Sequence, residues 1–225
     1  MKVTILGTGA FGLAISKVLI ENNNNVVMWT AFEEEKEELL KTKTSSKLKN
    51  YILDDRITIT TSLEECIKDS KLIVVAISMA YIRETCKKLK KYYKSNQYIC
   101  IASKGIEQNT CMFSHEIVKK ELKTKNVGVI SGPSFAIDLI NNVPVGLSSA
   151  SKSKRVLKII DEAFSSDKFK LYPTNDIIGV EVCGAFKNVI ALETGIIDGM
   201  NYPISTQALL ITDALHDVRL LINKL

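Results

Sequence analysis

The sequence is poor in the residues that mark disulfide-rich, metal-binding or disordered chains. It has 5 Cys, 4 Pro and 2 His among 225 residues. The cysteines are odd in number and widely spaced, without the paired clustering of a zinc site, so we expect reduced thiols and no metal. No cleavable apolar leader is evident, and no apolar run reaches the ~18 residues that a membrane span needs. We therefore expect a cytoplasmic protein.

The charge balance gives no strong indication of a polyanionic partner. The 30 Lys and Arg residues exceed the 25 Asp and Glu residues by 5, and the densest basic run, Lys87–Lys94, is typical of a solvated helix face. We predict no nucleic-acid partner. A hydrophobic content of 46% is enough for one large core and a smaller second unit.

Short apolar runs alternate with helical patterns up to about Thr174, which predicts βαβ units and a mainly parallel, doubly wound Rossmann sheet of the α/β class. The predicted strands are Val3–Leu6, Val26–Trp29, Ile57–Thr60, Leu72–Ile77, Tyr98–Ala102, Val127–Ile130, Val145–Ser148 and Lys168–Leu171.

Beyond Asp176 the apolar residues recur at helical spacing with no strand between them, which predicts helices over Ile177–Ile197 and Ile204–Ile222. Pro173 and Asn175 supply a break and a helix start. We expect a dinucleotide-binding domain over residues 1–174 and an incomplete, all-α substrate domain over residues 175–225.

The first strand leads into Gly7-Thr8-Gly9-Ala10-Phe11-Gly12, a Gly-x-Gly-x-x-Gly turn that opens a helix. In this context Gly7 allows a tight turn, Gly9 lets a pyrophosphate approach the backbone, and Gly12 permits close helix packing. The helix N-terminus then attracts phosphate. A tight turn that binds nothing explains the glycines less well, and we predict a dinucleotide site.

The cofactor preference stays open. NAD sites usually carry an acidic residue at the end of the second strand, but this chain has Trp29-Thr30-Ala31-Phe32 there. Glu33, Glu34 and Glu35 follow and are typical of a helix start, where acidic residues favour the dipole.

Two further predicted strands end in polar loops at the edge where α/β sheets bind ligands. Ser103-Lys104-Gly105 follows one strand, and Ser131-Gly132-Pro133-Ser134 follows the next. Lys104 suits a phosphate or carbonyl oxygen, although a surface lysine beside a turn glycine is an equal alternative. The small residues Gly132 and Ser134 leave room for a ligand.

The long helix carries Lys187 and Asn188 within an otherwise apolar stretch, Val182–Ala191. Burying an ammonium group is costly, so such a lysine either extends to solvent or has a function. Desolvation lowers the pKa of a lysine and allows it to act as a general base. We favour a function for Lys187.

Together these segments resemble the NAD(P)-dependent glycerol-3-phosphate dehydrogenase family. The shared motifs occur in family order along nearly the whole chain, at residues Gly7–Gly12, Ser103–Glu107, Ser131–Ala136 and Gly179–Ala191. The resemblance implies reversible hydride transfer between NAD or NADP and carbon 2 of dihydroxyacetone phosphate or sn-glycerol 3-phosphate, which feeds glycerophospholipid synthesis.

The resemblance also implies roles for individual residues. Lys187 would accept the proton in alcohol oxidation and return it in ketone reduction. The substrate-binding residues would be Lys104, Gly132, Ser134, Lys187 and Asn188. The cofactor-binding residues would be Gly7, Thr8, Gly9, Ala10, Phe11, Gly12, Lys104 and Ala136.

The chain departs from the family pattern at its C-terminus. Family members continue for roughly another hundred residues, the size of a small domain, whereas this sequence stops at Leu225. We expect a shortened helical domain without the acidic partner of Lys187 and the Arg-Asn pair that the family places there.

Two alternatives remain. One is a non-catalytic or truncated dinucleotide-binding protein that a partner completes. A homodimer through the C-terminal helices would cover the apolar stripe of Ile204, Ala208, Ile211, Leu215, Val218 and Ile222. The other is a related hydroxy-acid or ketopantoate-type reductase on the same architecture.

Overall fold

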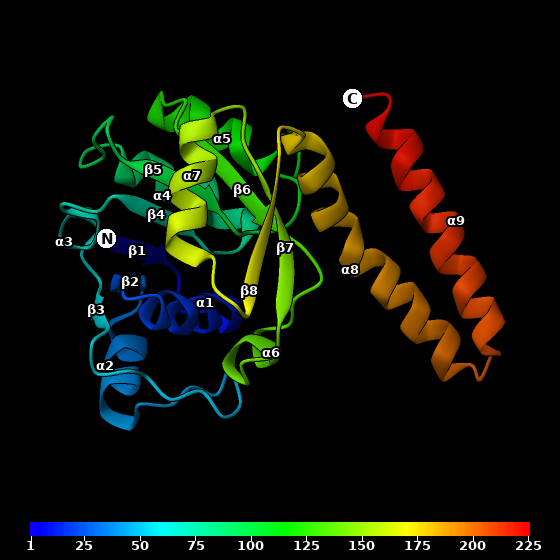
Figure 1. The fold of residues 1–225 in the computed structure, drawn as a ribbon, viewed down its shortest axis with the longest axis horizontal. Coiled ribbons are helices and arrows are strands. Elements are labelled where there is room, and N and C mark those ends of the chain that lie inside the picture. The colour runs from blue at the N-terminus through cyan, green and yellow to red at the C-terminus, as the bar shows by residue number, and fades with distance from the viewer.

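A computed structural model describes residues 1–225 and contains one eight-stranded sheet in the order β3-β2-β1-β4-β5-β6-β7-β8 (Figure 1). Neighbouring strands are parallel except β6 and β7, which are antiparallel. The mainly parallel sheet is therefore confirmed. The strands are β1 (Lys2–Leu6), β2 (Asn25–Trp29), β3 (Thr58–Thr60), β4 (Leu72–Val75), β5 (Tyr98–Ile101), β6 (Val127–Ser131), β7 (Val145–Ala150) and β8 (Phe169–Thr174).

All eight predicted strands form, and only their ends differ from prediction. The strand predicted to reach Ile77 ends at Val75, the last residue that pairs with β1 and β5. The last strand instead runs on to Thr174, because it pairs with β7 over its full length. Pairing with a neighbouring strand thus sets these ends, and the apolar pattern alone does not.

Helices cover both faces of the sheet, which confirms the doubly wound class. They are α1 (Ala10–Glu21), α2 (Glu33–Thr42), α3 (Leu63–Ile67), α4 (Met79–Leu89), α5 (Ser114–Leu122), α6 (Ala136–Ile140) and α7 (Lys154–Phe164). One core packs α1, α2, α6 and α7 on one face, and a second core packs α3, α4 and α5 on the other. In β1, Ile5 belongs to the first core and Leu6 to the second, because alternate side chains point to opposite faces.

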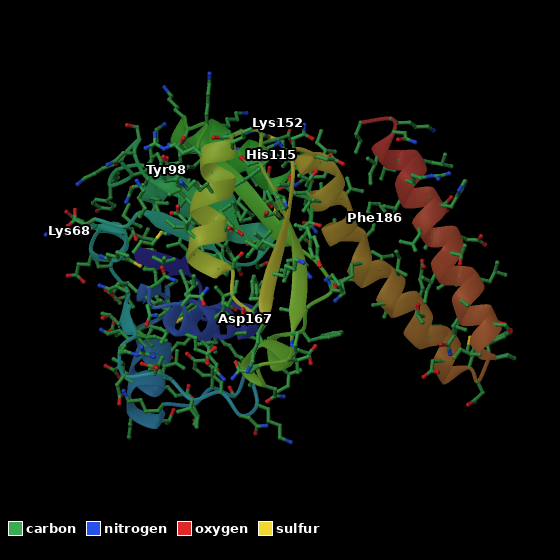
Figure 2. The ribbon with its side chains drawn as sticks, viewed as in Figure 1. Lys68, Tyr98, His115, Lys152, Asp167 and Phe186 are labelled. Atoms are coloured by element: carbon green, nitrogen blue, oxygen red, sulfur yellow. The ribbon has the colours of Figure 1, made fainter.

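The chain ends in two antiparallel helices, α8 (Ile177–Gly199) and α9 (Ile204–Ile222), which extend away from the β7–β8 side of the sheet (Figure 1). Asp176 caps α8 by accepting a 2.9 Å hydrogen bond from the backbone N–H of Gly179. Phe186 lies on the side of α8 that faces α9 (Figure 2) and packs against a small cluster of Phe113, Val182 and Val218. No helix in the structure combines the length and apolar character that crossing a bilayer requires.

Candidate functional site

The glycine loop connects β1 to α1 at the point where the strand order reverses, with β2 on one side of β1 and β4 on the other. Gly7 has φ +116°, and its N–H donates to the carbonyl of Trp29 at 2.8 Å. A Cβ atom on Gly7 would lie 2.6 Å from the carbonyl oxygen of Ala76. The loop is therefore fixed against both neighbouring strands.

Gly9 and Gly12 have opposite surroundings. A Cβ atom on Gly12 would lie 2.5 Å from the carbonyl oxygen of Gly7, whereas a Cβ atom on Gly9 would meet nothing within 4 Å. Gly12 thus allows α1 to approach the loop, and Gly9 leaves open space in front of the backbone at the N-terminus of α1. This is the geometry that a pyrophosphate group requires.

A cleft of about 1060 Å³, here called the glycine-loop cleft, lies in front of this turn. Of the predicted cofactor residues, Gly7, Thr8 and Gly9 line it, together with the end of β2 and the start of α4. Ala10, Phe11 and Ala136 are half-buried instead, and all three pack against the core that holds α1 and α6. Their predicted contact with a dinucleotide stays a prediction.

A second pocket of about 540 Å³, here called the lysine pocket, lies between the end of β6 and helices α8 and α9. Lys104, Gly132 and Lys187 all line it. Burial lowers the pKa of Lys104 below its ordinary value, and the neighbouring charge of Lys187 lowers it further. Lys104 and Lys187, which are far apart in the sequence, therefore line the same pocket.

Gly184 allows this meeting. A Cβ atom there would lie 2.8 Å from Ser131 Oγ and 3.9 Å from Lys104 Cγ, so α8 crosses close to the ends of β5 and β6. One turn later the ammonium of Lys187 lies 4.6 Å from the centre of the Phe135 ring, a cation–π contact. Lys187 is half-buried, so it is neither a fully solvated surface lysine nor a fully buried one.

The loop after β6 contains a buried polar group without a partner. Ser134 is 5% exposed, and its Oγ is the buried side-chain polar atom that forms no hydrogen bond in the structure. Such groups are rare because each costs free energy, and they often mark the place of a ligand. Asn188, by contrast, is exposed and does not line the lysine pocket, so nothing in the geometry joins it to the site.

Two charged clusters that the sequence did not reveal hold the site in place. Glu181 on α8 accepts a 3.0 Å hydrogen bond from the backbone N–H of His115 and pairs with the same residue's Nδ1. This buried contact attaches the start of α8 to α5 (Figure 2 labels His115). Arg83 on α4 binds Glu107 at 2.6 Å and Glu121 at 2.5 Å, which anchors the segment after Lys104.

Sequence reasoning also missed the place of Glu35 in α2, which lines the glycine-loop cleft. The predicted role of Glu33, Glu34 and Glu35 was to begin a helix, and α2 does begin at Glu33. The sequence held no signal that Glu35 also lines the cleft, because this position depends on how α2 packs beside β2.

Comparisons with known proteins place this chain among described families and folds. Residues 2–157 match the sequence model described as NAD-dependent glycerol-3-phosphate dehydrogenase N-terminus, and residues 176–225 match the corresponding C-terminus. Glycerol-3-phosphate dehydrogenase [NAD(P)+] of Fusobacterium nucleatum is 35% identical over 97% of this chain, and that of Leptospira biflexa is 36% identical over 97%.

Solved structures show the same fold. Glycerol-3-phosphate dehydrogenase from Coxiella burnetii superposes with a TM-score of 0.93 at 28% identity, covering 99% of this chain and 68% of that one. A ketopantoate reductase from Ralstonia eutropha reaches a TM-score of 0.59 at 12% identity, with 81% of this chain and 59% of that one covered, and shares the fold alone.

The chain spans 66% of the length of the F. nucleatum relative and 67% of the L. biflexa relative. The matches nevertheless cover both the Rossmann region and the start of the helical region in the order that the motifs predicted. The chain therefore belongs to the NAD-dependent glycerol-3-phosphate dehydrogenase family.

Proposed function

We propose that this protein interconverts sn-glycerol 3-phosphate and dihydroxyacetone phosphate with a nicotinamide dinucleotide. The observation that carries the proposal is the meeting of Lys104 and Lys187 in one pocket. Two nearby ammonium groups suit a small substrate that combines a phosphate with a hydroxyl or carbonyl group. Family membership supports the same reaction.

The glycine-loop cleft fits a dinucleotide. Gly9 leaves its backbone open, and the N-terminus of α1 adds N–H groups and the positive end of the helix dipole. Gly7, Thr8 and Gly9 would hold the pyrophosphate there, with Ala10, Phe11, Gly12 and Ala136 as the further predicted cofactor residues. When bound, the nicotinamide ring supplies or accepts the hydride.

The chain's own residues supply the proton chemistry. Lys187, in its neutral form, accepts the proton of the carbon 2 hydroxyl during oxidation and returns it during reduction. Lys104 binds and polarises the substrate. Its burial and the nearby charge of Lys187, which lower the pKa of Lys104, support this role. Gly132 lines the lysine pocket. Ser134 does not line it and stays a predicted substrate residue, whose buried hydroxyl a ligand would satisfy. Asn188 stays a predicted neighbour.

Turnover of the purified chain tests this proposal. We expect NADH or NADPH to be oxidised when dihydroxyacetone phosphate is added, and not when ketopantoate or another keto acid is added. Lys187→Ala abolishes turnover and leaves cofactor binding unchanged, because Lys187 lies outside the glycine-loop cleft. Lys152→Ala is the matched control, since Lys152 is exposed and lines neither cavity.

The outcomes separate the alternatives. Activity that survives Lys187→Ala contradicts the catalytic assignment. Cofactor binding without turnover of any substrate favours the non-catalytic dinucleotide-binding alternative, and turnover of keto acids alone favours the hydroxy-acid or ketopantoate-type alternative.

Several statements about organisation stay predictions. We propose a division into a dinucleotide domain over residues 1–174 and a helical substrate unit over residues 175–225, supported by the change from β8 to α8 at this point. A homodimer through the C-terminal helices is supported by the exposed apolar residues Ile204 and Leu215 of α9. The cytoplasmic location is likewise proposed.

A further inference from the structure

The end of β2 is where a Rossmann site distinguishes its two cofactors. An acidic side chain there accepts a hydrogen bond from the ribose 2′-hydroxyl of NAD, whereas a basic side chain accommodates the 2′-phosphate of NADP. In this chain Thr30, Ala31 and Phe32 follow β2 and line the glycine-loop cleft. None of the three is charged, so the distinction must come from another element.

Glu35 supplies a carboxylate at this place. It is the third residue of α2, which begins only three residues after Thr30, so the first helical turn brings Glu35 back over the end of β2. The Thr30 hydroxyl donates a 2.6 Å hydrogen bond to Glu35 Oε2. The side chain of Glu35 is 17% exposed and lines the same cleft as Gly7 and Thr8.

The carboxylate is held in its charged form. Burial acts to raise the pKa of Glu35, but hydrogen bonding to Lys47, Thr30 and Thr8 outweighs burial and leaves the pKa below its ordinary value. An ionised carboxylate has about four acceptor positions. The carboxylate accepts hydrogen bonds from Thr30 and Lys47 in the structure, which leaves capacity for a further donor from the cleft.

The nearest cation is already engaged. Lys47 forms an ion pair with Glu35 Oε1 and also lines the cleft. The other lysines of the cleft, Lys87, Lys88 and Lys91, come from α4 or directly follow it. This helix follows β4, which is separated from β2 by β1 in the sheet. At the β2 end, the cleft thus presents the Glu35 carboxylate with one cation, Lys47, which is already paired with it.

We propose that Glu35 is a specificity-determining residue that selects NAD over NADP. Its carboxylate accepts a hydrogen bond from the ribose 2′-hydroxyl of NAD, and its negative charge repels the 2′-phosphate of NADP. Lys47 neutralises part of this charge and has a latent second role, because it becomes available to a 2′-phosphate once the carboxylate is gone. The inference rests on the proposed dinucleotide site but not on the substrate or on catalysis.

Equilibrium binding to the purified chain tests the proposal without any turnover. Calorimetric titration with NADH and with NADPH gives the ratio of the two dissociation constants. We expect the chain to bind NADH at least ~10-fold more tightly than NADPH, as one lost hydrogen bond and one like-charge contact require. Glu35→Gln brings the ratio to within ~3-fold, because NADH binding weakens while NADPH binding tightens.

Two further variants identify the cause. Lys47→Ala, added to Glu35→Gln, removes the gain in NADPH affinity. Glu34→Gln makes the same charge change on the same helix turn outside the glycine-loop cleft, and it leaves the ratio unchanged.

The failures are distinguishable. If the chain binds neither NADH nor NADPH, the proposed dinucleotide site is wrong and the selectivity proposal falls with it. If both bind but the ratio is near one, or if Glu35→Gln alters it no more than Glu34→Gln does, only the role of Glu35 is overturned.

Discussion

The two glycines of the α1 turn provide a sharp test, because the structure gives them opposite tasks. Gly12→Ala places a Cβ atom 2.5 Å from the carbonyl oxygen of Gly7. That oxygen cannot move easily, because Gly7 has φ +116° and its own Cβ position lies 2.6 Å from the carbonyl oxygen of Ala76. Gly9→Ala meets nothing within 4 Å.

The magnitudes follow from these contacts. In Gly12→Ala, better helix propensity adds about 1 kcal/mol, but overpacking against fixed backbone costs about 3 kcal/mol, the upper part of the usual range. The net loss of unfolding free energy is about 2 kcal/mol. In Gly9→Ala, φ −69° and ψ 168° suit alanine. Alanine lowers the conformational entropy of the unfolded chain, which raises the free energy of unfolding by about 0.5 kcal/mol. This gain offsets a similar loss from replacing glycine at the helix N-cap.

Urea unfolding and NADH titration together check this prediction. Gly12→Ala loses stability while its folded fraction still binds NADH. Gly9→Ala keeps its stability within ~0.5 kcal/mol and loses NADH affinity at least ~10-fold, about 1.4 kcal/mol, because its methyl group occupies the space in front of the loop. Equal stabilities of Gly12→Ala and the unaltered chain, or a Gly9→Ala variant that binds NADH normally, would refute the reasoning.

Two other predictions concern the lysine pocket and its attachment. Folding lowers the pKa of Lys104 below 10.5, so between the folded-state pKa and pH 10.5 the unfolded chain binds more protons and the free energy of unfolding rises with pH. We expect Lys104→Met to lose this rise when urea unfolding midpoints are measured across alkaline pH. The same pH dependence in both proteins would contradict the prediction. Glu181→Leu leaves the buried N–H of His115 without its acceptor and lowers the unfolding free energy by about 2–4 kcal/mol. The control Glu193→Leu changes an exposed residue of the same helix and has little effect. Similar losses in both variants would show that the His115 contact is not the cause.

Local pattern was sufficient for the elements of this protein. The period of the apolar residues predicted eight strands and two C-terminal helices, because alternation and helical spacing are properties of a short segment. The glycine turn was also readable, since Gly7, Gly9 and Gly12 sit between a strand and a helix at the spacing that a dinucleotide turn needs. Family order then joined these motifs to Lys104 and Lys187.

What the sequence could not supply is the set of contacts between distant segments. Lys104 and Lys187 share a pocket only because α8 crosses the ends of β5 and β6 at Gly184. His115 and Glu181 are 66 residues apart, and neither has a local signal for the other.

Glu35 shows the same division within one short segment. Its position in the chain determined that it begins a helix, and α2 confirms this. Only the packing of α2 beside β2 decided that its carboxylate meets Thr30 and Lys47 in the glycine-loop cleft. Secondary structure follows from neighbours in sequence, whereas the chemistry of a site follows from neighbours in space, and those are set by sheet order and helix packing.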